Sequence, residues 1–263
     1  MTDWIDTHCH LDAAEFDADR AEVHASALNT GVGQIIVPAV DVANFAAVRA
    51  CCQQHPGCLP AYGIHPLYVM QANYPDVETV RTWLVEEKAV AVGEIGLDYF
   101  VANVARARQE HFFAAQLEVA RSLDLPVILH SRRAVDHVLK YLRRIRVHGG
   151  IAHAFNGSRQ QADAFIDMGF KIGFGGAMTF PGSRHIRDLA ATLPLEAIVL
   201  ETDAPDIPPV WLDHGRNSPA ELPRIAAVLA ELRGLSLDEI ANSCQRAARS
   251  ALRLPASHIE SHS

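Results

Sequence analysis

The sequence predicts an α/β protein with a (β/α)8, or TIM-barrel, fold, and three observations support the barrel. Short runs of β-branched and aliphatic residues alternate with longer stretches of helical spacing, which is typical of parallel strands joined by helices. Eight such runs occur in 263 residues, a length that suits one barrel. The first run ends in Thr7-His8-Cys9-His10 rather than in a glycine-rich phosphate-binding turn, which argues against a doubly wound open sheet.

Each predicted strand is followed by loop residues and then by a helical stretch. The strands are expected at Trp4–His8, Gln34–Ala39, Leu59–Ile64, Ala89–Glu94, Val127–His130, Gly150–His153, Phe170–Phe174 and Ile198–Glu201. The longest helical pattern, Ala105–Leu123, predicts an outer-ring helix. A helix over Ser236–Leu252, with Ser236 as its cap and Glu239 at the capping-box position, is expected to close one end of the barrel. We expect one barrel domain over residues 1–256 and a frayed tail over residues 257–263.

The composition is that of an ordinary globular protein, with 49% apolar and 21% charged residues. Five cysteines without a CxxC pair argue against a disulfide framework and favour a reducing compartment. With no leader-like segment or long apolar run in the sequence, we expect a cytoplasmic protein that contacts no membrane and needs no obligate protein partner. A net charge of −8 argues against broad electrostatic binding of duplex DNA, so any nucleic acid must be held locally.

The end of the first predicted strand carries a pair of histidines, His8 and His10. Residues two apart project from the same face of an extended chain, so both imidazoles can bind one metal ion. The alternative, a satisfied core histidine, holds for a single histidine better than for such a pair. Cys9 points the opposite way and is expected to be a small buried hydrophobe.

Four further polar residues close later strands: Glu94, His130, His153 and Asp203. The C-terminal ends of barrel strands converge on one mouth, so these side chains and the histidine pair are expected to meet in one cavity. Of the fourteen histidines, those in helical or loop segments, such as His24, are expected at the solvated surface.

These residues fall in a series of motifs, DTHCHLD, GIHP, GEIGLDY, ILHSR, AHAFNGS, ETDAP and GRNSPAELPRIAAVLAELRG, which run in order from Asp6 to about residue 250. Together they resemble the TatD-type deoxyribonucleases. The resemblance implies hydrolysis of DNA phosphodiesters and two divalent ions per subunit, of Zn, Mg or Mn. It implies one metal site of His8, His10, Glu94 and Asp203, and a second of Glu94, His130 and His153, with Glu94 bridging the two.

Chemistry gives an independent reason for such a set. Two ions about 3.5–4 Å apart can generate hydroxide from water and neutralise the charge that develops on phosphorus. Asp203 is the candidate general base, and Glu94 holds the spacing of the ions. His65, in the GIHP motif, is expected to face the scissile phosphate or leaving group, with a structural histidine as the alternative.

Substrate contacts are expected on two surfaces. Arg216 and Asn217, in the RNxP motif, either contact phosphate or fix a loop. Tyr99 and Phe100, with Arg132 and Arg133, are expected to stack on bases and hold phosphates of a single strand or a DNA end; rim packing is the alternative for the aromatic residues. The family commonly has Glu at Ser218 and Ser at Asn156, so substrate preference stays open.

Two rival functions remain. The first is an amidohydrolase-type enzyme acting on small molecules or esters, including deacylation of aminoacyl-tRNA. Glu94 argues against it, because binuclear members of that group often bridge their ions with a carboxylated lysine from the fourth strand. The second is a metal-binding barrel without activity, which is disfavoured because buried polar clusters cost stability unless they are ligated or paired.

Overall fold

The computed structural model describes residues 4–255, so the predicted tail over residues 257–263 lies outside the described residues. The strands are β1 (Trp4–Asp6), β2 (Val32–Pro38), β3 (Cys58–Tyr62), β4 (Ala91–Asp98), β5 (Val127–Arg132), β6 (Gly150–Ala152), β7 (Phe170–Phe174) and β8 (Ile198–Leu200). The α-helices are α1 (Arg20–Asn29), α2 (Phe45–Gln54), α3 (Asp76–Glu86), α4 (Arg106–Leu123), α5 (Val135–Arg144), α6 (Arg159–Asp167), α7 (Arg184–Thr192), α8 (Leu222–Arg233) and α9 (Leu237–Leu252).

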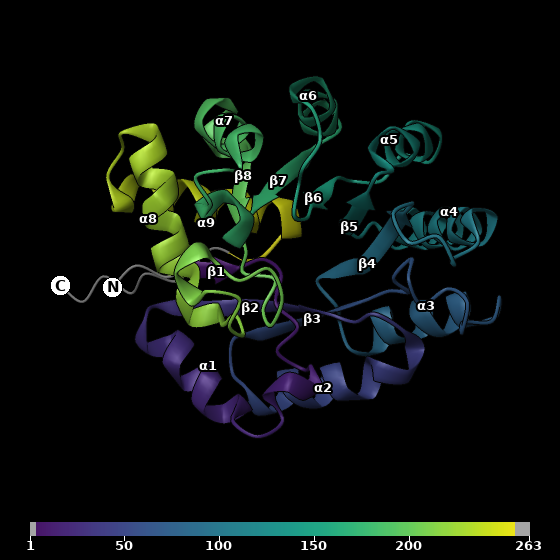
Figure 1. Cartoon of the computed structure of the whole chain (residues 1–263). Helices are drawn as coiled ribbons and strands as arrows, with labels where there is room; N and C mark the ends of the chain where they lie inside the picture. Colours follow the sequence, from purple (N-terminus) through teal and green to yellow (C-terminus); the bar gives the residue numbers. More distant parts are fainter. Residues whose placement is uncertain (1–3, 256–263) are drawn as a thin grey trace.

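Within the described residues, eight parallel strands form one sheet in the order β1 to β8, and helices surround it (Figure 1). The ring closes where the first and last strands end. There the Thr7 amide donates a hydrogen bond to the Leu200 carbonyl oxygen at 3.2 Å. The Asp203 amide donates a hydrogen bond to the His8 carbonyl oxygen at 2.8 Å. The predicted TIM barrel is therefore confirmed, and the C-terminal ends of all its strands share one mouth.

The opposite end of the barrel is closed by α9. Its small and apolar residues Ala247, Ala248, Ala251 and Leu252 pack against side chains from the strands, including Ala91 near the start of β4. The predicted capping box is present: Ser236 Oγ accepts from the Glu239 amide at 3.3 Å, and Glu239 Oε2 accepts from the Ser236 amide at 2.8 Å. A second apolar cluster fills the space between the strands and the outer helices. The open end of the barrel is thus the end that carries the polar residues.

The fourth strand differs from the prediction, which ended it at Glu94. β4 continues to Asp98, and all of its residues are buried. Val92 pairs with Val127 and Ile95 with Leu129, so β4 advances three residues while β5 advances two. The extra residue forms a β-bulge, which changes the direction of a side chain within a sheet. It places the Glu94 carboxylate inside the barrel mouth without ending the strand.

One surface prediction is wrong. His24 on α1 is buried, and its Nε2 atom lies 3.0 Å from the Pro56 carbonyl oxygen. Other histidines in helices, His111 and His137, are exposed, as expected for helical segments. Over residues 4–255, no helix combines the length and apolar character that crossing a membrane requires.

Candidate metal centre

The turn after β1 brings His8 and His10 together as the alternation of an extended chain predicts. Their Nε2 atoms face each other at 3.2 Å. His8 is fully buried, whereas the side chain of His10 is 17% exposed. Cys9, between them, is completely buried in the wall, as expected. One imidazole is therefore enclosed inside the barrel, and the other borders the cavity.

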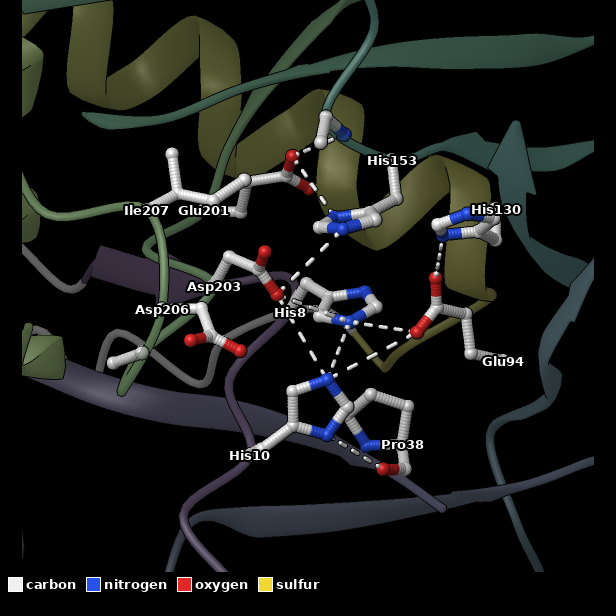
Figure 2. A network of polar contacts seen from close by, with 12 residues as sticks. His8, His10, Pro38, Glu94, His130, His153, Glu201, Asp203, Asp206 and Ile207 are labelled. Carbon is white, nitrogen blue, oxygen red and sulfur yellow. Dashed lines mark hydrogen bonds and ion pairs between the residues drawn. The ribbon is translucent and has the colours of Figure 1, made fainter. Parts of the chain in front are cut away.

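Glu94 from β4 and Asp203 from the loop after β8 complete this group (Figure 2). His8 Nε2 lies 3.4 Å from Glu94 Oε2 and 3.6 Å from Asp203 Oδ1. His10 Nε2 lies 3.9 Å and 3.8 Å from the same two oxygens. Nitrogen and oxygen ligands placed about 2.0–2.2 Å from one ion are themselves about 3–3.5 Å apart. The donor atoms thus have the type and approximate spacing of a metal site.

Three groups of donor atoms, each with its atoms within 4.8 Å of one another, could hold a metal ion. They are His8 with Glu94 and His153, His8 with His10 and Asp203, and His65 with Glu94 and His130. The six predicted ligands therefore gather at one mouth. The grouping differs from the predicted second site in one respect: His65, rather than His153, joins Glu94 and His130.

Glu94 connects the groups through its two oxygens. Oε2 faces His8, whereas Oε1 lies 3.6 Å from His65 Nε2 and 3.0 Å from His130 Nδ1. A carboxylate that offers one oxygen to each side can bridge two ions. His153 occupies the other side, with its ring stacked on His8 at a centroid distance of 3.6 Å and its Nε2 atom 3.6 Å from Asp203 Oδ1.

A layer of carboxylates behind the donors was not assigned from the sequence. Glu201 Oε1 lies 3.1 Å from His153 Nδ1, and Asp98 Oδ2 lies 3.0 Å from His130 Nε2. Asp6 accepts hydrogen bonds from the Thr202 amide and hydroxyl at 2.9 and 2.5 Å, which fixes the strand end before Asp203. Such partners orient ligating side chains and tune their basicity. The sequence signal for them was their presence in the GEIGLDY, ETDAP and DTHCHLD motifs.

Burial and the neighbouring charges set the protonation of the histidines. Burial, with His153 close by, holds the pKa of His8 well below its usual range, and burial lowers the pKa of His65 to about 3. Burial also opposes the charged form of His130 and His153. Hydrogen bonds to Asp98 and Glu94 nevertheless raise the pKa of His130 to about 9, and Glu201 and Asp203 raise that of His153 to about 10.

Burial and neighbouring charges also shift the pKa values of the two carboxylates of the cluster, in opposite directions. Burial alone would raise the pKa of Glu94, but His65 and His8 hold it well below its usual range. For Asp203 burial prevails over the opposing effect of His153, and its pKa rises to about 6. Glu94 is thus an anion at neutral pH, while Asp203, with a pKa of about 6, can exchange a proton there.

A cavity of about 1500 Å³ opens in front of this cluster. Its lining includes His65, Phe100, Arg132 and Arg133, together with His10, Glu94, His130, His153 and Asp203. Tyr99 does not line it; its hydroxyl donates to Glu110 at 2.7 Å. The structure therefore brings Phe100 and the two arginines to the cavity, whereas Tyr99 takes part in packing at the rim.

Arg216 and Asn217 lie away from the cavity lining. Asn217 is completely buried, and its Nδ2 donates to the carbonyl oxygens of Thr202, Asp206 and Ile207 at 2.7, 2.9 and 3.2 Å. Arg216 forms a two-bond ion pair with Asp19 at 2.9 and 2.6 Å. These contacts fit the loop-fixing alternative that the sequence left open.

A TIM barrel that gathers imidazoles and carboxylates at its mouth is the architecture of a metal-dependent hydrolase. The family model for TatD related DNase matches residues 5–253, and the chain belongs to this family. It is 42% identical over 243 residues to the uncharacterized metal-dependent hydrolase YjjV of Escherichia coli K12, covering 91% of this chain and 94% of that protein.

The crystal structure of YjjV, a TatD homologue from Escherichia coli K12, superimposes with a TM-score of 0.92 at 40% identity, covering 96% of this chain and 98% of that one. The chain is also 31% identical over 258 residues to a protein of Pantoea sp. strain At-9b named 3'-5' ssDNA/RNA exonuclease TatD, covering 95% of this chain and 99% of that protein.

Proposed function

We propose that this metal-dependent hydrolase cleaves phosphodiester bonds of DNA, acting exonucleolytically on single strands or strand ends. The observation that carries the proposal is the gathering of the six predicted metal ligands, Glu94 among them, at one cavity whose lining also includes Arg132 and Arg133. Hydrolysis of a phosphodiester needs a nucleophile at neutral pH and compensation of negative charge, and this arrangement provides places for both.

Divalent ions held by these donors would supply hydroxide from water and neutralise charge on the phosphate. The side chains act around that centre. Glu94 fixes the spacing of the donor groups through its two oxygens. Asp203 accepts the proton of the attacking water at Oδ1, since its pKa of about 6 suits a base at neutral pH. His65, uncharged at that pH, either completes the second donor group or faces the leaving oxygen.

Cavity size and charge favour a polymer over a small metabolite. A site for a small ligand typically encloses about 300–1,000 Å³ and buries most of the ligand. Here the space is about 1500 Å³ and includes both aromatic and cationic side chains at its edge. An exposed aromatic ring can stack on any base, and arginine neutralises phosphate locally. The name of the Pantoea relative, 3'-5' ssDNA/RNA exonuclease TatD, agrees with this substrate class.

The proposal is tested with one panel of substrates. Metal-loaded protein is incubated with end-labelled single-stranded and duplex oligonucleotides, and in parallel with nitrophenyl esters and lactones. We expect stepwise shortening of single strands that stops when a chelator is added, and no comparable ester turnover. Ester or lactone hydrolysis without any cleavage of oligonucleotides would reject the nuclease in favour of the ester-hydrolase alternative.

A further inference from the structure

The charged residues of the cavity rim are divided between two sides of the barrel. Phe100 follows β4, and Arg132 and Arg133 lie at the end of β5; we call these three residues the basic arc. Asp12 and Glu15 follow β1, and Asp206 follows β8; we call these three the acidic arc. In a ring ordered β1 to β8, the β4–β5 side lies opposite the β8–β1 side. The metal centre therefore sits between arcs of opposite charge.

The basic arc is organised around the Phe100 ring. The Arg132 guanidinium carbon lies 3.7 Å from the ring centroid, and that of Arg133 lies 4.6 Å from it. Phe100 is 46% exposed, so these contacts leave much of the residue open to the cavity. Asp136, a carboxylate on the same side, accepts a hydrogen bond from Gln161 at 2.7 Å. Two arginines against this one carboxylate leave this side of the cavity positive, next to an aromatic surface.

The acidic arc carries charge that the protein does not neutralise. Within residues 4–255, no cation is paired with the carboxylates of Glu15 and Asp206, which are exposed. Arg216 approaches Glu15, but it donates to the Glu15 carbonyl oxygen and pairs with Asp19. Asp12 is partly buried, and its Oδ2 accepts from Asn44 at 2.7 Å.

Two further observations place these carboxylates together. Burial raises the pKa of Tyr68, which also lines the cavity, and the negative charges of Asp41, Glu15 and Asp206 raise it further. Figure 2 shows Asp206 on the same side of the cluster as Asp203, with Glu94 and His130 on the opposite side. One edge of the cavity is therefore a surface of hydrogen-bond acceptors with net negative charge.

We propose that this division makes the cavity selective for strand ends that carry a free hydroxyl. The inference rests on the proposed nuclease function. The phosphates of the retained strand lie along Arg132 and Arg133, with a base against Phe100, and the scissile phosphate lies at the metal centre. The terminal nucleoside lies against Glu15 and Asp206, whose oxygens accept hydrogen bonds from its hydroxyl and amino groups and repel a terminal phosphate.

The test compares four single-stranded oligonucleotides of one sequence, with hydroxyl or phosphate at the 3' end combined with hydroxyl or phosphate at the 5' end. We expect a phosphate at the end from which residues are removed to lower kcat/KM by at least about tenfold. Because exposed charges are screened by salt, the ratio between hydroxyl and phosphate ends should shrink as ionic strength rises.

Variants separate the roles of the two arcs. Combined Glu15→Gln and Asp206→Asn should reduce the preference for a hydroxyl end, whereas combined Arg132→Ala and Arg133→Ala should raise KM for all four substrates and leave the preference in place. Arg144→Ala removes an exposed arginine on the outer helix α5 and serves as the matched control.

The outcomes distinguish the two proposals. Equal rates on hydroxyl and phosphate ends, or a preference unchanged by Glu15→Gln with Asp206→Asn, would overturn the role of the acidic arc while leaving the nuclease intact. Absence of cleavage of all four oligonucleotides by metal-loaded protein would overturn the nuclease itself.

Discussion

Glu201 holds His153 in place: its Oε1 atom lies 3.1 Å from His153 Nδ1 and accepts a hydrogen bond from the Ala154 amide at 2.6 Å. Both residues are buried. Nδ1 of His153 is turned toward Glu201, and its Nε2 atom is the one that faces Asp203. A carboxylate behind a ligating histidine fixes the orientation of the ring and makes its free nitrogen a better ligand.

The first prediction follows from this contact. Glu201→Gln should lower the affinity for divalent ions about 10–100-fold, because the substitution removes the negative charge that supports His153. Equilibrium dialysis against Zn and Mn measures the effect. Glu231→Gln, at an exposed position on α8, is the control and should leave affinity unchanged. Full metal affinity in Glu201→Gln would mean that the carboxylate contributes only packing.

The second prediction concerns the two carboxylates of the centre. Glu94→Ala and, separately, Asp203→Asn should abolish cleavage of single-stranded oligonucleotides, since in the proposed mechanism one is the bridging carboxylate and the other a ligand and proton acceptor. Both variants should still unfold cooperatively on heating, which circular dichroism will check, because the barrel core does not depend on them. Turnover retained by either variant would contradict the two-ion scheme.

The third prediction is a pH dependence of metal binding. With pKa values of about 10 and about 9 in the metal-free protein, His153 and His130 carry a proton near pH 7. A ligating imidazole nitrogen must be free of its proton, so binding has to release protons, and affinity should rise with pH up to about 9. Calorimetric titrations in buffers of different ionisation enthalpy measure the release. Identical heats in all buffers would exclude this protonation.

The fourth prediction tests the basic arc through salt dependence. Each phosphate contact on single-stranded nucleic acid contributes about 0.7 to the slope of log affinity against log salt. Combined Arg132→Ala and Arg133→Ala should therefore reduce the slope by about 1.4 for binding of a single-stranded oligonucleotide. Binding is measured in the Asp203→Asn background to prevent digestion, with Arg144→Ala in the same background as control. An unchanged slope would show that the two arginines do not contact phosphate.

Much of the fold and of the ligand set could be predicted because both follow from local patterns. The alternation of apolar runs and helical stretches located every strand, and convergence of strand ends in a barrel brought together residues as distant as His8 and Asp203. The end of β4 could not be placed in the same way. In the sequence, a carboxylate after an apolar run resembles the end of a strand. The bulge that places Glu94 inside β4 depends on how β4 pairs with β5, which the sequence of β4 does not show.

The residues that support the ligands could not be predicted from the sequence, for a different reason. Glu201 and Asp98 lie in strands or at strand ends like the ligands themselves, and only the direction of each side chain separates a ligand from its support. Loop residues are harder still, because their partners are remote: Asn217 bonds three carbonyl oxygens, and Arg216 reaches Asp19. For His24, burial under the chain at Pro56 depends on tertiary packing that helical spacing does not reveal.

The amide of Asn217 joins the backbone next to Asp203 to the backbone of Asp206. Under the proposed function, this one buried side chain, which lies outside the cavity lining, holds both the loop that carries the proton acceptor and the residue that faces the strand terminus. A substitution that loosens Asn217 is therefore expected to change reaction rate and choice of strand terminus together.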